Sequence, residues 1–358
     1  YVLRVPKGQV EIEISGMGIM DTRRRLMVYD AGRLDIELED KMYTLGEVTV
    51  TAGMRKNVED VQMGVQKLAV QELKTIPTAF GELDILRIVQ TLPGVKTMGE
   101  ASGGFNVRGG ATDQNLILFN ENTVFNPTHL FGFFSAFNGN VLDDMELYKS
   151  SIPPKYGGRI SSVLNVNSRK GDKEEYHGEV SLGLLTSSFN IEGPLKKKKT
   201  SFLLSGRTTY SDWILGIIPE KSGYKNGKAG FYDANALISH QFNSRNHLYL
   251  NGYYSYDRFN FVEEEKYNYT NINASMKWVH LFKENFRSSV SMGYDHYDYA
   301  TENYANENDA YKMSFDINQY FLKSDFEVSG LKGHTLNWGV NGILYDVLPG
   351  KVLPASAS

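Results

Sequence analysis

The sequence of 358 residues contains no cysteine, which excludes disulfide bonds and thiolate metal sites. Basic and acidic residues nearly balance, and a formal net charge of -4 gives no field that would favour nucleic acid as a partner. No apolar run approaches the roughly 20 residues that a membrane-spanning helix needs. The seven histidines are scattered, and none has the spacing of metal ligands on a helix. The sequence therefore predicts no metal site and no nucleic-acid partner.

Signals for catalysis are missing as well. The glycine pairs at 103–104 and 109–110 lack the spacing and the following helix of a phosphate-binding loop. No nucleophile elbow occurs. Adjacent carboxylates are present at Asp143 and Asp144 and at 263–265, but neighbours on a strand or loop need not converge on one point. We therefore predict that the protein is not an enzyme and uses no cofactor.

Tyrosine and phenylalanine are abundant, with 22 Tyr and 19 Phe beside only 3 Trp. Their rings suit membrane interfaces, although β-rich proteins in water have them too. From about Gly171 on, apolar and polar residues alternate along long segments, which is typical of strands with two unlike faces. In water this pattern predicts a sheet packed on one side; in a membrane it predicts lipid outside and a wet lumen inside.

The two faces are clearest in four segments. The apolar faces comprise Phe202, Leu204, Gly206, Thr208 and Tyr210; Leu248, Leu250, Gly252, Tyr254 and Tyr256; Ile272, Ala274, Met276 and Trp278; and Met313, Phe315 and Ile317. The opposite, polar faces comprise Ser201, Ser205, Arg207 and Thr209; Asn251, Ser255 and Asp257; Asn271, Asn273, Ser275 and Lys277; and Lys312, Ser314, Asp316 and Asn318.

The connections between these segments favour the membrane. Short turns at 196–199, 243–246 and 283–285 alternate with mostly longer and more polar connections, as periplasmic turns and outer loops do. Strands of roughly 12 to 16 residues exceed the usual 5 or 6 of globular proteins. An aromatic girdle is expected from the tyrosines near strand ends, namely Tyr253, Tyr254, Tyr256, Tyr294, Tyr297 and Tyr299.

A series of motifs between about Gly81 and Gly171 is the most specific signal. It runs Asp84-Ile-Leu-Arg-Ile-Val-Gln-Thr-Leu-Pro-Gly-Val95, Gly104-Phe-Asn-Val-Arg-Gly-Gly110, Asn115-Leu-Ile-Leu-Phe-Asn120, Tyr148-Lys-Ser150, Tyr156-Gly-Gly-Arg159 and Val163-Leu-Asn-Val-Asn167. In order and spacing the series resembles the plug domain of a TonB-dependent outer-membrane receptor, of Bacteroidetes-like and non-starch-type character. The resemblance implies a mostly β protein, in which an α+β plug precedes the antiparallel transmembrane strands of a barrel in the bacterial outer membrane.

The segment before the plug divides into two parts. Val10–Ile14 and Leu34–Leu38 alternate apolar and charged residues, and they resemble the last strands of a carboxypeptidase regulatory-type β-sandwich. Short helices are expected at Val70–Ile76 and Leu83–Val89, the second ended by Pro93-Gly94. The expected division is 1–44 for the sandwich, 45–53 for a TonB-box-like segment, 54–171 for the plug and 172–358 for about eight barrel strands.

The segment at 45–53 has two interpretations. It is one more strand, since Val48 and Val50 share a face, or it resembles a TonB box with Thr49 where the family has a valine. Such a box adds as an edge strand to a partner sheet, so that main-chain hydrogen bonds carry the load. The resemblance implies a TonB-type inner-membrane energy-coupling protein as partner and assigns the box to Glu47, Val48, Thr49, Val50, Thr51 and Ala52.

Two plug motifs are predicted to be structural and gating rather than ligand-binding. Gly109 and Gly110 permit tight turning of the backbone beside a strand. Arg108 is expected to be a buried cation that locks the plug to carboxylates of the barrel wall through its planar fork. The full set of predicted gating residues is Arg108, Gly109, Gly110, Gly157, Gly158 and Arg159.

The loop from Asn126 to Ser135 is dense in aromatic residues. In one interpretation it packs against the barrel interior; in the other it is the plug apex that faces an external ligand. In the second case Phe131, Phe133 and Phe134 form an apolar floor with a few polar groups, as binding sites do. The polar groups are then Asn126 and His129.

The size of the barrel is a separate deduction. A barrel of roughly 8 strands has an interior only wide enough for side chains, whereas plugged transporters use roughly 22. A plug of about 100 residues has a radius of gyration near 13 Å and does not fit the smaller barrel. An open sheet in lipid would also expose two unpaired edges, at several kcal/mol for each unsatisfied group. We therefore expect this chain to be an N-terminal part of a longer barrel.

The function implied by the resemblance is import of a scarce nutrient across the outer membrane, energised by proton-motive force and gated by the plug. Its partners are the TonB-type protein on the periplasmic side, outer-membrane lipid, and a small-molecule, peptide or glycan ligand. One alternative is a plugged barrel that serves as a structural or secretion-associated interaction platform with surface lipoproteins. A second alternative is a soluble all-β binding protein.

Overall fold

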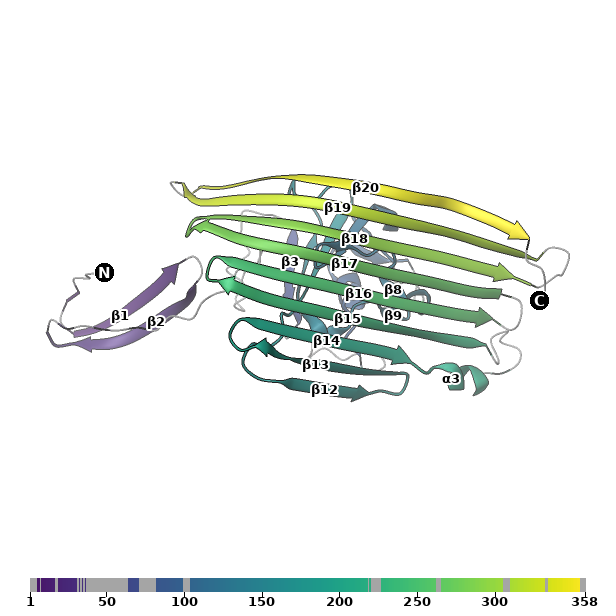
Figure 1. Ribbon diagram of the computed structural model, residues 1–358, viewed down its shortest axis with the longest axis horizontal. Coiled ribbons are helices and arrows are strands. Elements are labelled where there is room, and N and C mark those ends of the chain that lie inside the picture. Colours follow the sequence, from purple (N-terminus) through teal and green to yellow (C-terminus); the bar gives the residue numbers. More distant parts are fainter. Residues whose placement is uncertain are drawn as a thin grey trace.

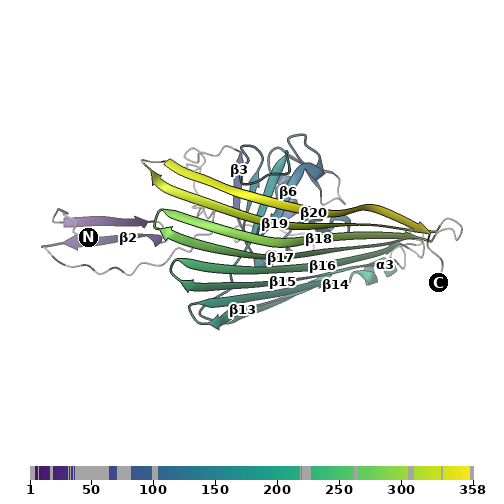
Figure 2. The same ribbon diagram turned by 45° about the horizontal axis from the view of Figure 1, so that its top comes forward.

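The computed structural model describes residues 5–6, 8–16, 19–30, 32, 34, 36, 64–70, 82–98, 104–217, 219, 227–261, 265–304, 310–331 and 334–354. A sheet of nine strands dominates these residues, and a smaller unit with a five-stranded sheet lies against one of its faces (Figure 1). Figure 2 shows that the large sheet is curved. The predicted fold class, mostly β with an α+β unit ahead of a long antiparallel sheet, is confirmed.

An antiparallel hairpin precedes these sheets. Strand β1 (Gly8–Gly16) pairs with β2 (Ile19–Val28), with an irregularity between Ile14 and Gly16. The hairpin forms a two-stranded sheet of its own and lies apart from the others in both views (Figures 1 and 2). Of the second expected strand, Leu34–Leu38, only Leu34 and Ile36 are among the described residues, and the predicted TonB-box-like segment lies outside them.

The unit against the large sheet spans residues 64–169 and is called the plug below. Its sheet has the order β3-β10-β11-β6-β7, with a parallel pair between β11 and β6. The strands of this sheet are β3 (Val65–Ala69), β6 (Asn115–Phe119), β7 (Asn122–Thr123), β10 (Leu142–Tyr148) and β11 (Ser162–Ser168). The remaining elements are α2 (Ile85–Thr91), β4 (Val95–Thr97), β5 (Phe105–Val107), η3 (Thr112–Gln114), β8 (Thr128–His129), η4 (Leu130–Gly132), β9 (Phe134–Ser135) and η5 (Gly139–Val141).

Helix α2 confirms the second predicted helix. It begins where the carboxylate of Asp84 accepts hydrogen bonds from the backbone N–H groups of Leu86 at 2.9 Å and Arg87 at 3.1 Å, an N-cap. Ile85, Leu86 and Val89 point into the plug core. Only Val70 of the first predicted helix is among the described residues. None of the helices in the described ranges is long and apolar enough to cross a membrane.

The large sheet is called the wall below. Each strand pairs antiparallel with the next one in the sequence, and the sheet is open at β12 and β20. Its strands are β12 (His177–Leu182), β13 (Thr186–Lys196), β14 (Thr200–Thr209), β15 (Lys228–Asn243), β16 (Asn246–Phe261), β17 (Glu265–Lys283), β18 (Phe286–Asn303), β19 (Tyr311–Leu331) and β20 (His334–Pro354). A short helix, α3 (Asp212–Ile217), follows β14. The nine strands are one more than the expected eight or so. Strands β15 and β16 have 16 residues, at the upper end of the predicted range, and those from β17 on are longer than predicted, at 18 to 21 residues.

The two predicted faces of β14, β16 and β17 are present, and the polar face is the buried one. Ser205, Asp257 and Asn271 are at most 3% exposed, because they lie between the wall and the plug. Leu204 and Leu250 on the opposite face are 44% and 38% exposed. The wall therefore turns its charged and amide side chains toward the plug and its apolar side chains outward.

The prediction of faces is wrong for the first half of β19. Its residues alternate with period two, and Gln319 is buried against the plug, so Phe315 and Ile317 also face inward while Lys312 and Asp316 face outward. The reason is that this part of the strand extends beyond the outward apolar rows of the sheet. The tyrosine prediction divides in the same way: Tyr254, Tyr256 and Tyr294 lie on the outward face, but Tyr253, Tyr297 and Tyr299 face inward.

Candidate functional site

The contact between plug and wall is the candidate functional site, and much of it is made by amide side chains. Nδ2 of Asn138 donates to Oγ of Ser205 at 2.7 Å. Nδ2 of Asn273 donates to the carbonyl oxygen of Thr123 at 2.9 Å. One such bond contributes about 1 kcal/mol. These hydrogen bonds from amide side chains therefore fix the register of the plug against the wall. The ionic groups described next supply stronger attachments.

The plug loop from 126 to 135, called the apex loop below, contains two strained residues in a row. Leu130 and Phe131 have positive φ angles of 48° and 57°. A left-handed conformation at a non-glycine residue costs of order 1–3 kcal/mol and needs surrounding structure to hold it. The wall supplies that structure, because the backbone N–H of Leu130 donates to Oδ1 of Asp257 at 3.0 Å.

His129 connects the apex loop to two wall carboxylates. Its Nδ1 lies 2.7 Å from Oδ2 of Asp257 and its Nε2 lies 3.3 Å from Oδ2 of Asp233, with all three side chains buried. The imidazole stacks on Phe231 at 4.1 Å between ring centroids. Burial alone would lower the pKa of His129, but the two carboxylates outweigh it and raise that pKa above its ordinary value. The arrangement therefore favours a charged imidazolium inside the interface.

Arg207 of β14 forms the second ionic attachment. Its Nε lies 2.8 Å from Oδ2 of Asp233, and its Nη1 donates to Oε2 of the plug residue Glu82 at 2.9 Å. Its Nη2 donates to the carbonyl oxygen of Ser135 in the apex loop at 2.7 Å. The planar guanidinium thus holds two parts of the plug and one wall carboxylate at once, which a lysine ammonium does not match in geometry.

The third attachment is a buried wall carboxylate, Asp295, held by N–H donors. It accepts from Nδ2 of Asn122 at 2.7 Å and the backbone N–H of Thr123 at 3.0 Å, both in the plug. It also accepts from Nδ2 of Asn273 at 2.7 Å and Nε2 of Gln319 at 2.9 Å on the neighbouring strands. Strand β7 is therefore fixed to β18 of the wall, and with it the turn that joins β6 to β7.

Glu121, at the tip of that turn, has two cationic partners. Lys277 and Lys323 of the wall donate to its two carboxylate oxygens at 2.7 and 2.9 Å. Burial raises the pKa of Glu121, but the two ammonium groups outweigh burial and hold that pKa well below its ordinary value. Lys323 also lies over the ring of Tyr156 at 5.4 Å. The plug carboxylate is thus clamped between two wall cations.

Inward-facing aromatic rings gather around the exposed side of the apex loop. Phe131 lies beside the rings of Phe259 at 5.1 Å, Tyr267 at 5.4 Å and Tyr269 at 6.3 Å. Farther along the wall Phe125 lies 6.5 Å from Tyr297, which in turn lies 5.9 Å from Phe315. Such an arrangement offers flat apolar surfaces with hydroxyl groups at their edges, which suits binding of an organic ligand.

The structure divides the five predicted apex residues. Phe131 and Phe133 are 39% and 46% exposed, and contact of these two with a ligand stays a prediction. His129 is fully buried and Phe134 is 6% exposed, so the prediction that these two face a ligand is wrong. Their rings are instead taken up by the wall, where both pack on Phe231. Asn126 is half-buried and uses its Oδ1 to accept from the backbone N–H of Thr128 at 3.3 Å.

Arg108 is not the buried cation that the sequence predicts. It lies exposed in a turn after β5 with a φ of 50°, and its backbone N–H donates to the carbonyl oxygen of Gly94 at 3.0 Å. A buried cation does lock plug and wall, but it is Arg207, and it lies on the wall while a carboxylate, Glu82, lies on the plug. The expected chemistry is therefore present with the two partners exchanged.

The predicted gating glycines lie in two tight turns. Gly109 has a φ of 86°, and a Cβ on Gly110 would lie 2.2 Å from Oγ of Ser161, so each position suits glycine alone. In the second motif Gly158 has a φ of 82°, and Gly157 and Arg159 beside it are exposed. Gly157, Gly158 and Arg159 line a small cavity that also contains Glu121 and Lys323. The second motif therefore adjoins the ionic clamp.

Sequence reasoning did not single out most of the residues that join plug and wall. Arg207 and Asp257 were placed on polar strand faces without a role, and Glu82, Glu121, Asp233, Asp295 and Lys323 were not identified. For the wall residues among them, the signal that the sequence offers is a charged residue on the inward face of a predicted strand. Within the described ranges, no three His, Asp or Glu side chains gather as metal ligands would.

Comparison with protein-family models gives no match, and comparison with curated proteins gives none either. Solved structures match in fold. For the siderophore receptor PirA from Acinetobacter baumannii the TM-score is 0.60 at 16% identity, over 83% of this chain and 50% of that one. For FpvA from Pseudomonas aeruginosa, solved with heterologous pyoverdines, the TM-score is 0.62 at 12% identity, over 83% of this chain and 44% of that one.

The copper transporter OprC is a third similar structure, with a TM-score of 0.60 at 11% identity over 81% of this chain and 47% of that one. At these identities the likeness defines the fold, which is that of plugged β-barrel receptors. This chain spans about half the length of each of these proteins.

Proposed function

We propose that this chain contains the plug and the first part of the barrel of a TonB-dependent receptor that imports a scarce nutrient across the bacterial outer membrane. The observation that carries the proposal is that the wall buries its polar face and exposes its apolar face. Inward side chains such as Arg207 and Asp257 are charged and buried, while outward side chains such as Leu204 and Leu250 are apolar and exposed. A sheet in water buries its apolar face, whereas a membrane barrel exposes it to lipid. Similar folds in siderophore and copper receptors support the same conclusion.

Two belts of outward aromatic rings support the placement in a membrane. One belt lies at the end of the short turns and consists of Phe242, Trp278, Phe282, Phe286 and Trp338. The other lies toward the longer connections and consists of Tyr232, Tyr254, Tyr256, Tyr294 and Tyr320. Along β16, Asn246 and Tyr254 are eight residues apart, which at about 3.4 Å per residue and a tilt near 40° corresponds to roughly 20 Å. This is close to the apolar band of about 25 Å of outer-membrane barrels.

The ionic attachments support a gate that needs energy to open. Breaking a buried ion pair by separating one partner costs about 3–5 kcal/mol. Release of His129 from Asp257 and of Glu82 from Arg207 together would then cost about 6–10 kcal/mol, which is roughly a 10⁴- to 10⁷-fold bias against spontaneous opening. A pulling force on the plug is the input that the proposal assigns to the TonB-type partner.

The coupling segment remains part of the proposal. Residues 45–53 lie outside the described residues, and the motif Glu47–Ala52 is assigned from the sequence alone. An extended segment of this kind pairs with a partner sheet by β-augmentation. The division into 1–44, 45–53, 54–171 and 172–358 and the periplasmic location of the N-terminal region belong to the same proposal.

The ligand is expected to contact the exposed rings of the apex loop. Phe131 and Phe133 are exposed beside the inward-facing Tyr267, and the chain turns sharply there through two strained residues. Strain of this kind is retained where surrounding structure and function require it. Ligand binding at these rings would alter a loop that His129 and Leu130 fasten to the wall, which links the outside to the ionic gate.

A growth screen tests the proposed function. The full-length gene is deleted, and growth and uptake are compared with the parent strain on iron chelates, other metal complexes, glycans, peptides and vitamins as sole sources. The proposal predicts a loss confined to one nutrient and its restoration by the intact gene. If no nutrient is affected, import is contradicted, and co-purification of surface lipoproteins would then support the interaction-platform alternative.

A further inference from the structure

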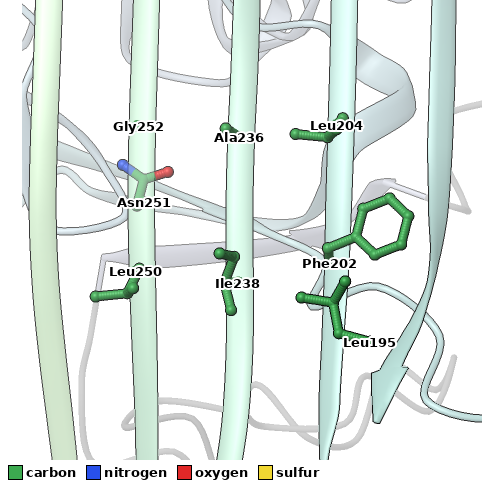
Figure 3. A pocket seen from close by; sticks show the side chains of 8 residues that line it. All are labelled: Leu195, Phe202, Leu204, Ala236, Ile238, Leu250, Asn251 and Gly252. Carbon is green, nitrogen blue, oxygen red and sulfur yellow. The ribbon is translucent and has the colours of Figure 1, made fainter. Parts of the chain in front are cut away.

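The outward face of the wall carries an apolar groove of about 590 Å³, a size typical of ligand pockets. It is lined by Leu195, Phe202, Leu204, Ala236, Ile238, Leu250, Asn251 and Gly252. Figure 3 shows Phe202, Ile238 and Leu250 in one row across neighbouring strands, and Leu204, Ala236 and Gly252 in the next. The side chain of Asn251 hydrogen-bonds to plug residues, so the open surface of the groove is apolar.

Two small residues create this groove. Ala236 and Gly252 are directly opposite each other in the pairing of β15 with β16, and larger side chains surround them. A Cβ on Gly252 would meet only the carbonyl oxygen of Ala236, at 3.8 Å, so the space beside it is open and not filled by a neighbour. A chain of methylene groups placed there would bury apolar surface on both sides, at about 25 cal/mol for each Å² removed from water.

A basic turn lies at one end of the groove. Leu195, which lines the groove, directly precedes Lys196–Lys199, which are the last residue of β13 and the three-residue turn that leads to β14. The turn is fixed in place because the backbone N–H of Gln241 donates to the carbonyl oxygen of Lys199 at 2.7 Å. All four lysines are exposed, and no carboxylate in the described part of the chain pairs with them. The next turn along the same edge adds the exposed Arg245.

The acidic residues at 172–175 lie beside this turn, where the backbone N–H of Lys198 donates to the carbonyl oxygen of Lys173 at 3.1 Å, but they do not neutralise it. Asp172 accepts hydrogen bonds from the backbone N–H groups of Glu174 and Glu175 and contacts His177 at 3.1 Å. Glu174 and Glu175 themselves are exposed, and their two charges are fewer than the four of the lysine turn. An excess of positive charge therefore remains beside an apolar groove, at the end of the wall where the aromatic rings of Phe242 and Trp278 lie.

We propose that this surface is a binding site for one anionic phospholipid in the membrane leaflet at the short-turn end, with an acyl chain in the groove and its phosphate at Lys196–Lys199. Basic residues at a membrane edge attract anionic headgroups, and the groove fixes the attached chain. A zwitterionic lipid would gain the apolar contacts of the groove but little electrostatic attraction from the basic turn. The inference rests on the proposed placement in a membrane but not on nutrient transport.

Native mass spectrometry of the full-length receptor, released from nanodiscs of equal phosphatidylglycerol and phosphatidylcholine, tests the site. The unaltered protein should retain phosphatidylglycerol at least tenfold over phosphatidylcholine. The triple variant Lys197→Gln, Lys198→Gln, Lys199→Gln should lose at least tenfold of that preference. The matched triple variant Lys228→Gln, Lys266→Gln, Lys312→Gln, at the other end of the strands, should keep it. Equal retention of the two lipids, or an equal loss in both triple variants, would overturn the proposal.

A second pair of variants tests the groove. Gly252→Leu fills it from the outward face and should lower the number of retained lipids, with either headgroup. Gly342→Leu, also on the outward face, has only a carbonyl oxygen at 4.0 Å near its Cβ and should leave retention unchanged. Unchanged lipid retention in Gly252→Leu would contradict the placement of an acyl chain in the groove. Because lipid retention is measured on purified protein, a negative growth screen would leave this result intact and would bear on transport alone.

Discussion

Nδ1 of His129 lies 2.7 Å from Oδ2 of Asp257, and neither side chain has more than 1% of its surface exposed. The two residues are 128 positions apart in the sequence, one in the apex loop of the plug and the other in β16 of the wall. The same carboxylate accepts the backbone N–H of Leu130, which has a strained φ angle. One wall carboxylate therefore holds both the charge and the conformation of the loop that is expected to meet the ligand.

Replacing Asp257 by asparagine should loosen the apex loop. The substitution keeps the shape of the side chain but leaves His129 with a weaker partner inside the interface, for which we expect a loss of about 3 kcal/mol. Hydrogen exchange at the Leu130 amide, measured by mass spectrometry of peptides from the loop, should become about 100-fold faster. Asp298→Asn, on the outward face of β18, is the control and should leave this exchange rate within twofold. An unchanged rate in Asp257→Asn would show that the ion pair does not hold the loop.

The lysine of Arg207→Lys should not replace the contacts that the arginine makes. One ammonium group does not reach Asp233, Glu82 and the carbonyl oxygen of Ser135 in the geometry of the planar fork. We expect a loss of about 2 kcal/mol for lysine and about 3–5 kcal/mol for Arg207→Met, which leaves Asp233 buried without its guanidinium. The measurement is the rate of hydrogen exchange in α2, which begins three residues after Glu82 and should exchange faster in both variants. Arg287→Lys, whose partner Glu327 also lies on the wall, should leave α2 unchanged.

The clamp on Glu121 predicts a pH dependence of plug stability. Because its pKa in the folded protein lies below the ordinary value of 4.5, the clamp contributes fully above about pH 4.5 and is lost as the pH falls through the lowered pKa. Glu121→Gln should lower the free energy of plug unfolding by about 3 kcal/mol at pH 7. The difference from the unaltered protein should shrink progressively below about pH 4.5.

Calorimetry of the first unfolding transition of the full-length protein, between pH 3 and pH 7, measures this difference. Glu302→Gln, which removes a rim carboxylate paired with Lys312, is the control and should not alter the plug transition. A difference between Glu121→Gln and the unaltered protein that grows in acid would have the wrong sign for a carboxylate with a lowered pKa.

The absence of cysteine allows the plug to be tethered to the wall at a chosen point. Nδ2 of Asn138 and Oγ of Ser205 are 2.7 Å apart, so the pair Asn138→Cys and Ser205→Cys places one thiol on each side of the interface at this contact. Uptake of the nutrient found in the growth screen should stop under oxidising conditions and resume on reduction. The pair Asn115→Cys and Ser162→Cys ties the plug only to itself and should not affect uptake. Continued uptake with an oxidised plug–wall tether would contradict a gate that must move.

The sequence predicts the local elements well but not which of them meet. Alternation separated the two faces of β14 and β16 because a strand has a strict period of two. It failed on the first half of β19, where the outward face is polar and the inward face carries Phe315, because period alone does not say which face meets lipid. The outward apolar rows of the sheet end within the strand, and the pattern of inward and outward residues reverses there.

The ionic contacts between plug and wall cannot be predicted from the sequence, for a related reason. The motif around Arg108 suggested a buried cation on the plug, yet the cation is Arg207 on the wall, 125 residues from its plug partner Glu82. His129 was expected to face a ligand, but two wall carboxylates from separate strands surround it. Such partners are set by how the plug sits against the wall, and no spacing along one segment encodes them.

The most direct test of the central claim compares binding with uptake after removal of residues 45–52 from the full-length protein. The nutrient found in the growth screen is supplied to cells, and surface-bound and internal amounts are measured separately. The account predicts unchanged surface binding and an internal amount as low as in the strain without the gene. Unchanged uptake would contradict energised coupling through this segment.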